Sequence, residues 1–306
     1  DMADTRNWAF PADLQPDPDA FDFDLARVLD AVVSVRTEVP EDAFTASILG
    51  TERLGNGVVI RGDGLVLTIG YLITEASSIW LTTNHGTVAG GYPLAYDQAT
   101  GFGLVQPLAP LGVAALPRGS AAACEIGDNA ILAGHGGRKH ALKTRIFAMR
   151  EFAGYWEYVL DKALFTAPAH PQWGGAALLG EDGRLLGIGS LLVQEQVDER
   201  PLQGNMIVPI DILEPILDDL LTRGRVSTPP RPWLGVYTAD VGRKIAVAGL
   251  AEGGPAERAD VQVGDVVLEV VADRRVTFDA PVQTGVGVGE GWIAAGLRGG
   301  RLGLAR

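Results

Sequence analysis

Histidine, serine and cysteine side chains are the groups of this chain that could carry nucleophilic or metal chemistry. Acyl transfer needs a hydroxyl that an imidazole activates and a carboxylate that orients the imidazole. A metal site needs several ligands on a rigid scaffold. The chain has one cysteine, Cys124, and four histidines, of which only His135 and His140 are close in sequence. We therefore expect no metal site, no cofactor and no intrachain disulfide.

His170 and Ser190 are the two residues that we single out as candidates for a site. His170 lies close to Gln172 and Trp173, and we take these three residues as candidates to line a cleft. A histidine in such a place more often bonds a backbone carbonyl, and we favour that interpretation. Ser190 could be a displaced nucleophile, but no histidine lies at a predictable distance from it, so we favour a polar pocket residue.

Short strands are expected to position these side chains. Glycine accounts for 40 of 306 residues and proline for 18, and this glycine share is roughly twice the usual ~7%. Many short strands separated by turns predict an all-β sandwich or barrel. Apolar or alternating runs bounded by Gly, Asp or Pro predict strands at 31–40, 78–82, 129–133, 157–165 and 185–193, and a hairpin over 56–68.

One helix and a proline-rich segment divide the chain. Asp211 is expected to cap a helix whose apolar residues between 212 and 221 share one face, and Gly224 to end it. Three prolines over 225–232 predict a linker. The predicted organisation is an aromatic, Asp- and Pro-rich arm at 1–24, a first domain at 25–224, that linker, and a second domain at 233–306.

The charge and hydropathy of the chain exclude several classes of partner. The formal net charge is −13, and the chain has no long Lys/Arg run, so we expect no nucleic acid partner. The longest uncharged run, 98–117, contains three prolines, so we expect no membrane span. The first residues lack a basic and apolar leader, and we expect any signal peptide to lie outside this chain.

Several segments, taken in order, resemble the HtrA/Deg family of trypsin-like serine proteases. Residues 55–68 (GNGVVIRGDGLVLT) are similar to the hairpin that precedes the family's catalytic histidine. The resemblance implies a chymotrypsin-like double β-barrel with a C-terminal helix, followed by a PDZ-like domain. It also implies a periplasmic or cell-envelope protein and a homotrimer held by the N-terminal arm. Further similar segments are 116–120, 125–128, 174–175, 180–189, 209–211 and 254–268.

The resemblance aligns the three catalytic positions of the family with residues of other types. Tyr71 stands for the histidine, Gly101 for the aspartate and Gly174 for the serine. A glycine supplies neither a nucleophile nor a carboxylate, and a tyrosine of ordinary pKa is a poor base at neutral pH. Gln172 and Trp173 also replace the Gly-Asn pair of the oxyanion turn.

These substitutions predict that the protein is not an enzyme but an HtrA-like pseudoprotease. It would bind or scaffold unfolded proteins or peptide C-termini. Two alternatives stay open. One is a serine-type endopeptidase with a displaced catalytic site, and the other is a regulatory subunit of an active HtrA-type protease.

The second domain is expected to bind peptides by strand addition. The segment Trp233, Leu234, Gly235 and Val236 looks like the loop by which PDZ domains of the family accept a terminal carboxylate. The resemblance weakens after residue 271, which leaves the completeness of this domain open.

Overall fold

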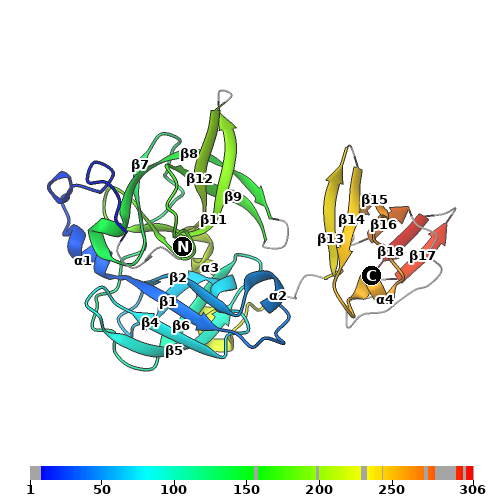
Figure 1. Ribbon diagram of the computed structural model, residues 1–306, viewed down its shortest axis with the longest axis horizontal. Coiled ribbons are helices and arrows are strands. Elements are labelled where there is room, and N and C mark those ends of the chain that lie inside the picture. Colours follow the sequence, from blue (N-terminus) through cyan, green and yellow to red (C-terminus); the bar gives the residue numbers. More distant parts are fainter. Residues whose placement is uncertain are drawn as a thin grey trace. The chain divides into compact units, whose positions relative to one another are not determined.

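The computed structural model contains two units, residues 1–227 and residues 228–306 (Figure 1). The structure describes residues 8–154, 158–197, 200–228, 233–242, 244–271, 275–279, 294–298 and 301–305.

The first barrel of unit 1 closes in the strand order β1, β2, β3, β6, β5, β4. The hairpin expected over 56–68 is present as β2 and β3, and its turn has Gly64 at φ 87°, a left-handed conformation that favours glycine. Asp63 Oδ1 accepts a hydrogen bond from Leu65 N at 3.3 Å within this turn. The strands are β1 (Val32–Glu38), β2 (Glu52–Val59), β3 (Val66–Ile69), β4 (Ser78–Thr82), β5 (Val88–Tyr96) and β6 (Phe102–Pro107).

The second barrel closes in the order β10, β11, β12, β9, β8, β7. Strands β11 and β12 shift register between Gly189 and Leu191, so Ser190 is an extra residue in β11. Such a β-bulge redirects the side chain and carbonyl of the inserted residue. The strands are β7 (Asn129–Ala133), β8 (Ala141–Ala153), β9 (Val159–Ala167), β10 (Ala177–Leu179), β11 (Leu185–Val197) and β12 (Arg200–Pro209). The all-β expectation is therefore confirmed.

Short helices connect the strands of unit 1. They are η1 (Pro18–Ala20), α1 (Leu25–Asp30), α2 (Ala46–Leu49), η2 (Gly70–Leu72), η3 (Gly137–His140), η4 (Ile210–Ile212) and α3 (Glu214–Arg223). The turns η2 and η3 and the helix α2 lie near the site described below. In the part of the chain that the structure describes, no helix is long and apolar enough to cross a membrane.

The predicted C-terminal helix is present, but its expected N-cap is wrong. The helix α3 begins at Glu214, and its N-cap residue, Leu213, makes no side-chain cap bond. The Asp211 carboxylate instead accepts hydrogen bonds from Ser120 Oγ and, at 2.7 Å, from Ala121 N. The Asp211 carboxylate thus bonds Ser120 and Ala121, which are distant in sequence, and does not cap the helix. The expected end is confirmed, since Gly224 has φ 69°.

The N-terminal arm packs on the second barrel of its own chain. Phe10 N donates to Lys139 O at 3.0 Å, and the Trp8 ring stacks on His140 with centroids 4.5 Å apart. The His140 ring nitrogens lie 2.7 Å from the carbonyl oxygens of Trp8 and His135. The aromatic residues of the arm are therefore docking residues within this chain.

Unit 2 is a six-stranded sheet in the order β13, β14, β15, β16, β18, β17. Its elements are β13 (Val236–Val241), β14 (Lys244–Leu250), α4 (Pro255–Arg258), β15 (Val266–Val271), β16 (Arg275–Asp279), β17 (Ala294–Arg298) and β18 (Arg301–Ala305). Strands β13 and β17 are its two edge strands. Much of the glycine-rich stretch after residue 279 lies outside the described residues.

Candidate functional site

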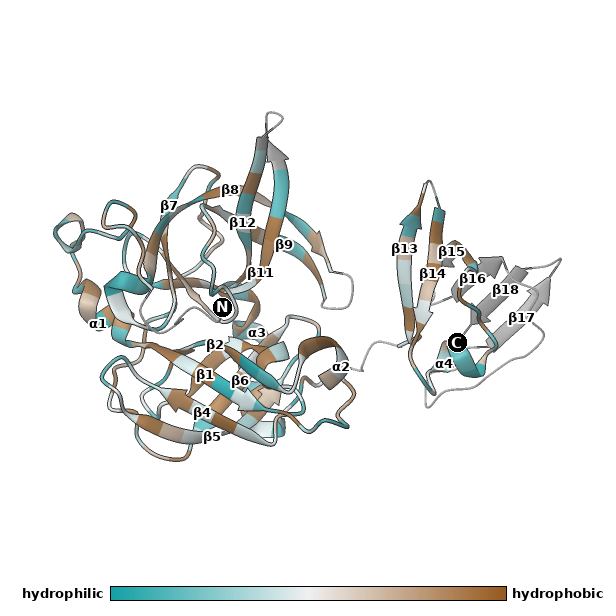
Figure 2. Cartoon of the chain, viewed as in Figure 1, coloured by the Kyte–Doolittle hydropathy of each residue, from teal (hydrophilic) through white to brown (hydrophobic). Residues whose placement is uncertain are grey.

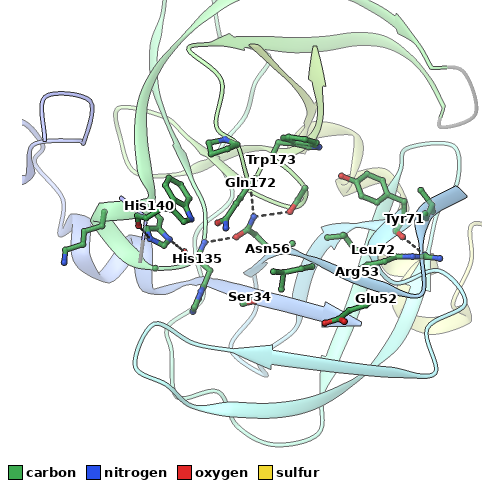
Figure 3. Close-up of a pocket in the computed structure, with 18 of the residues that line it drawn as sticks. Ser34, Glu52, Arg53, Asn56, Tyr71, Leu72, His135, His140, Gln172 and Trp173 are labelled. Atoms are coloured by element: carbon green, nitrogen blue, oxygen red, sulfur yellow. Dashed lines mark hydrogen bonds between the residues drawn. The ribbon is translucent and has the colours of Figure 1, made fainter. Parts of the chain in front are cut away.

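A cleft of about 810 Å³ on unit 1 is lined by residues of both barrels (Figure 3). The first barrel contributes residues of β1, β2 and η2, and the second contributes the loops around 135–140 and 171–174. Trp8 of the arm also lines it. In Figure 3, Tyr71 and Leu72 lie toward one end of the cleft and His140 toward the other.

Tyr71 and Gly174 meet at one end of this cleft. A Cβ atom placed on Gly174 would lie 2.8 Å from the Tyr71 hydroxyl, so the tyrosine occupies the space that a side chain at position 174 would need. The backbone of Tyr71 is held by the Arg53 guanidinium, which donates to Tyr71 O at 2.7 Å. The structure therefore brings together two of the three positions that the resemblance singled out.

Ser190 lies between two tyrosines. The Tyr71 hydroxyl donates to Ser190 O at 2.7 Å, and the Ser190 hydroxyl is hydrogen-bonded to the Tyr158 hydroxyl. The bulge in β11 lets one residue present its carbonyl to Tyr71 and its hydroxyl to Tyr158. Ser190 is fully buried. We call these three residues the Tyr–Ser–Tyr cluster.

Gly101 joins this cluster through Tyr158. A Cβ atom on Gly101 would lie 2.2 Å from the Tyr158 ring, and Gly101 has φ +80°. Both the packing and the backbone therefore require glycine there. Gly101 O accepts from Gly70 N at 2.7 Å, which connects this position to the turn that carries Tyr71.

His170 is a buried structural residue that holds the loop 170–174. Its Nε2–H donates to His140 O at 2.9 Å, and its Nδ1 accepts from Gln172 N at 3.0 Å. Asn205 Oδ1 accepts from His170 N at 2.7 Å. Burial lowers the pKa of His170 to about 4, so the imidazole is neutral at pH 7. Both ring nitrogens are occupied, as the interpretation of a carbonyl-bonded histidine requires.

The N–H of Gln172 is not available to an anion in the cleft, because it donates to His170 Nδ1. This N–H lies two residues before Gly174 and points at His170 rather than into open space. Gln172 and Trp173 both line the cleft, as expected for the cleft candidates. Ser190 and His170 do not line it.

Asn56 is a site residue that the sequence analysis missed. Its Nδ2 donates to Gln172 O at 2.9 Å and Gly174 O at 3.1 Å, and its Oδ1 accepts from His135 N at 2.8 Å. Asn56 is 2% exposed. It belongs to β2 of the first barrel, so one side chain fastens two loops of the second barrel. The signal was an amide side chain between two glycines, Gly55 and Gly57, within the predicted hairpin.

The histidines do not form a metal site among the described residues, where no group of three or more His, Cys, Asp or Glu could hold an ion. Burial lowers the pKa of His135, and its Nε2 is buried without a hydrogen-bond partner. Cys124 is a free cysteine whose pKa burial raises.

The predicted carboxylate loop of unit 2 precedes the edge strand β13. Trp233 is 54% exposed, and Gly235 has φ 71°. The carbonyls of Leu234 and Gly235 accept from Ala256 N and Ala251 N, both at 2.9 Å, and Val236 pairs with Leu250 in the sheet. Its binding of carboxylates stays a prediction.

Comparison with known families and proteins identifies the fold. A model described as a trypsin-like peptidase domain matches residues 55–188. The solved structure of HtrA-type protease AlgW with tripeptide has a TM-score of 0.53 and 18% identity, and covers 92% of this chain and 94% of that one. AlgW with decapeptide has a TM-score of 0.51 at 16% identity, and covers 92% of this chain and 96% of that one. The expected trypsin-like double barrel is confirmed.

Curated relatives match about 70% of this chain. Serine endoprotease DegS of Haemophilus influenzae is 25% identical over 229 residues, which are 72% of this chain and 66% of DegS. A probable periplasmic serine endoprotease, DegP-like, of Halomonas elongata is 26% identical over 230 residues, which are 71% of this chain and 47% of that protein. The chain thus spans about half to two thirds of the length of these relatives.

The expectation that the protein is not an enzyme is wrong. We based it on the residue types at positions 71, 101 and 174. The relatives that match the chain are named serine endoproteases, and the matching model describes a peptidase domain. These findings favour the endopeptidase alternative. Residues 55–188 match the model of a trypsin-like peptidase domain, and HtrA-type serine proteases are the proteins that the chain resembles.

Proposed function

We propose that this protein is a serine-type endopeptidase of the HtrA type that binds an extended polypeptide along β11 and in the cleft, and acts on it from a displaced catalytic site. The observation that carries the proposal is the position of the Tyr–Ser–Tyr cluster. Tyr71 lines the cleft, and its hydroxyl is bonded to Ser190 in β11.

The edge of β11 supports polypeptide binding by strand addition. Among the described strands, β11 pairs with β10 only over 185–188; Gly189 then bonds Gly175 and Ala176, Ser190 O accepts from Tyr71, and from Leu191 on β11 pairs with β12 alone. The opposite edge therefore has backbone groups available to an added strand. Leu192 in this stretch is 43% exposed. An extended peptide on this edge would pass Tyr71 and Gly174 and enter the cleft.

Ser190 is the residue to which the proposal assigns the nucleophile. Its Oγ would form the acyl bond while the amide nitrogen of the substrate leaves with a proton, and water would then release the acyl group. The Ser190 proton would pass to the Tyr158 hydroxyl while the Tyr158 hydroxyl proton passes, through water, to the leaving amide nitrogen, so that the tyrosine stays neutral overall. Because Ser190 is fully buried, this attack requires the residues that cover Ser190 to move while the Ser190–Tyr158 hydrogen bond is kept. His170 is not the base, since both of its ring nitrogens are occupied.

The test is incubation of the full chain with unfolded casein and, separately, with a fluorophosphonate that labels reactive serines. We expect cleavage and labelling in the original protein and neither in Ser190→Ala. Cys124→Ser is the matched control and should keep both. Casein that stays bound but intact, with no labelled serine, would overturn the endopeptidase proposal.

Three further properties are part of the proposal. The family resemblance supports a periplasmic or envelope location and a homotrimer through the N-terminal arm. A monomer in light scattering at micromolar concentration would contradict the trimer. The second unit is proposed to be PDZ-like and to bind peptide C-termini through residues 233–236. Equal binding of free and amidated C-termini would contradict this.

A further inference from the structure

An apolar surface borders the cleft beside β2. Leu49 and Leu54 line the cleft, and Ile48 precedes Leu49 in α2. Ile48 is 54% exposed and Leu54 66% exposed. Figure 2 shows the α2 segment as strongly hydrophobic. We name Ile48, Leu49 and Leu54 the apolar shelf.

The loop that carries the shelf is held in place by a buried arginine. Arg53 is 4% exposed, and its guanidinium donates to Thr45 Oγ1 at 2.8 Å and Gly50 O at 3.2 Å. These two bonds fasten the loop on either side of α2. Burying a guanidinium costs free energy unless it is fully hydrogen-bonded, so this arrangement fixes the loop firmly.

A strained glutamate adds a second constraint on the same loop. Glu75 has φ 58°, a left-handed conformation that is costly for a residue other than glycine. Its carboxylate accepts from Phe44 N at 3.0 Å and Thr45 N at 2.8 Å. The buried Arg53 and the strained Glu75 therefore both hold the loop, and with it the apolar side chains of the shelf, in a fixed position beside the cleft. Preorganisation of this kind lowers the entropic cost of binding.

The position of the shelf relative to β11 defines which part of a bound chain would reach it. A strand added to β11 in the antiparallel sense would run from the Val197 end toward Ser190. It would then pass Tyr71 and Gly174, which line the cleft together with Leu54. The C-terminal half of such a polypeptide would lie on the shelf.

The charges near the shelf are acidic. Glu41 and Asp42 are exposed in the same loop, and Glu52 lines the cleft with its Oε1 accepting from Arg36 Nε at 2.9 Å, so Glu41 and Asp42 carry the acidic border. The Arg53 charge points into the loop and donates to backbone and threonine oxygens. An apolar surface with an acidic border complements an apolar residue followed by a basic one.

We propose that the apolar shelf binds bulky apolar side chains, followed by a basic residue, in the C-terminal half of the polypeptide that lies in the cleft. This inference rests on the proposed function, because it takes its occupant from polypeptide binding in the cleft. The shelf would select among substrates by burying side chains such as leucine against Ile48 and Leu54.

Fluorescence polarisation with three synthetic peptides tests the inference on the full chain. One peptide carries Leu-Leu-Lys in its C-terminal half, one carries it in its N-terminal half, and one carries Ser-Ser-Lys in its C-terminal half. We expect the first to bind about tenfold more tightly than the third, as partial burial of two leucine side chains on the shelf implies. The double variant Ile48→Ser/Leu54→Ser should lose this preference.

A matched control changes equally exposed apolar residues elsewhere on the first barrel. Val88→Ser/Leu108→Ser alters residues that are 58% and 71% exposed and do not line the cleft, and it should keep the preference. Equal affinities for all three peptides, or an equal loss of the preference in both double variants, would contradict binding at the apolar shelf. Polypeptide binding in the cleft would still stand. Failure of every peptide to bind would overturn the proposed function as well. If the shelf variant instead abolishes self-association seen in sedimentation, the shelf contacts a second copy and the inference is wrong.

Discussion

Acidification is expected to destabilise unit 1 through His170. Burial lowers its pKa in the folded protein to about 4, whereas the unfolded chain should titrate near 6.5. The folded state therefore holds the neutral imidazole, and the unfolded state binds the proton more readily. This contribution to stability is present above pH 6.5 and is lost as the pH falls from 6.5 to 4.

The size of the effect follows from the difference between the two pKa values. A difference of about 2.5 units corresponds to about 3 kcal/mol, of which about 2.5 kcal/mol should be lost between pH 7.5 and pH 4.5. The hydrogen bonds explain why the proton is excluded. Nδ1 accepts from Gln172 N, so a proton on Nδ1 would leave two donors facing each other.

Urea unfolding followed by tryptophan fluorescence at several pH values measures this effect. The original protein and His170→Gln should differ in free energy of unfolding by about 2.5 kcal/mol less at pH 4.5 than at pH 7.5. The variant retains His135, whose pKa burial also lowers, so the comparison isolates His170. Parallel pH profiles for the two proteins, or an NMR titration of His170 near pH 6.5, would refute the reasoning.

Three substitutions test the packing around the cleft. Gly101→Ala should lower the free energy of unfolding by about 3 kcal/mol, because its Cβ would meet the Tyr158 ring, but by only about 1 kcal/mol in a Tyr158→Ala background. Equal penalties in urea unfolding of both backgrounds would contradict this. Asn56→Ala should lower the free energy of unfolding by about 2–4 kcal/mol in the same assay, because it removes three hydrogen bonds between the barrels. A loss below about 1 kcal/mol would contradict the role of Asn56 in joining the barrels. Tyr71→Phe should free the Ser190 carbonyl and tighten peptide binding about fivefold in fluorescence polarisation, and an unchanged affinity would show that the hydroxyl does not compete.

Local sequence patterns predicted strands at the positions of β1 to β4, β7, β9 and β11, but not β5, β6, β8, β10 or β12. The alternation over 31–40 and the Gly-Asp-Gly turn near 63 correspond to β1 and the β2–β3 hairpin. Gly224 ends α3 as expected. These features depend on side-chain alternation and on the φ values that glycine allows, which neighbouring residues largely determine.

Local reasoning was insufficient where distant segments compete for the same group. Asp211 was expected to cap the helix that follows, but Ala121 N, which is 90 residues away in sequence, donates to it. Asn56 similarly bonds carbonyls more than 100 residues further along the chain. No pattern around either residue encodes these partners.

The sequence by itself determined the apolar or alternating runs of seven barrel strands, the net charge of −13, and the residue types at positions 71, 101 and 174. Only the tertiary structure decided that Tyr158 fills the space beside Gly101, that Ser190 lies between two tyrosines, and that His170 is sealed as a neutral imidazole. The reason is physical: strand periodicity arises between neighbouring residues, whereas burial and hydrogen-bond partners in this site arise from strands and loops of both barrels that meet only after the chain has folded.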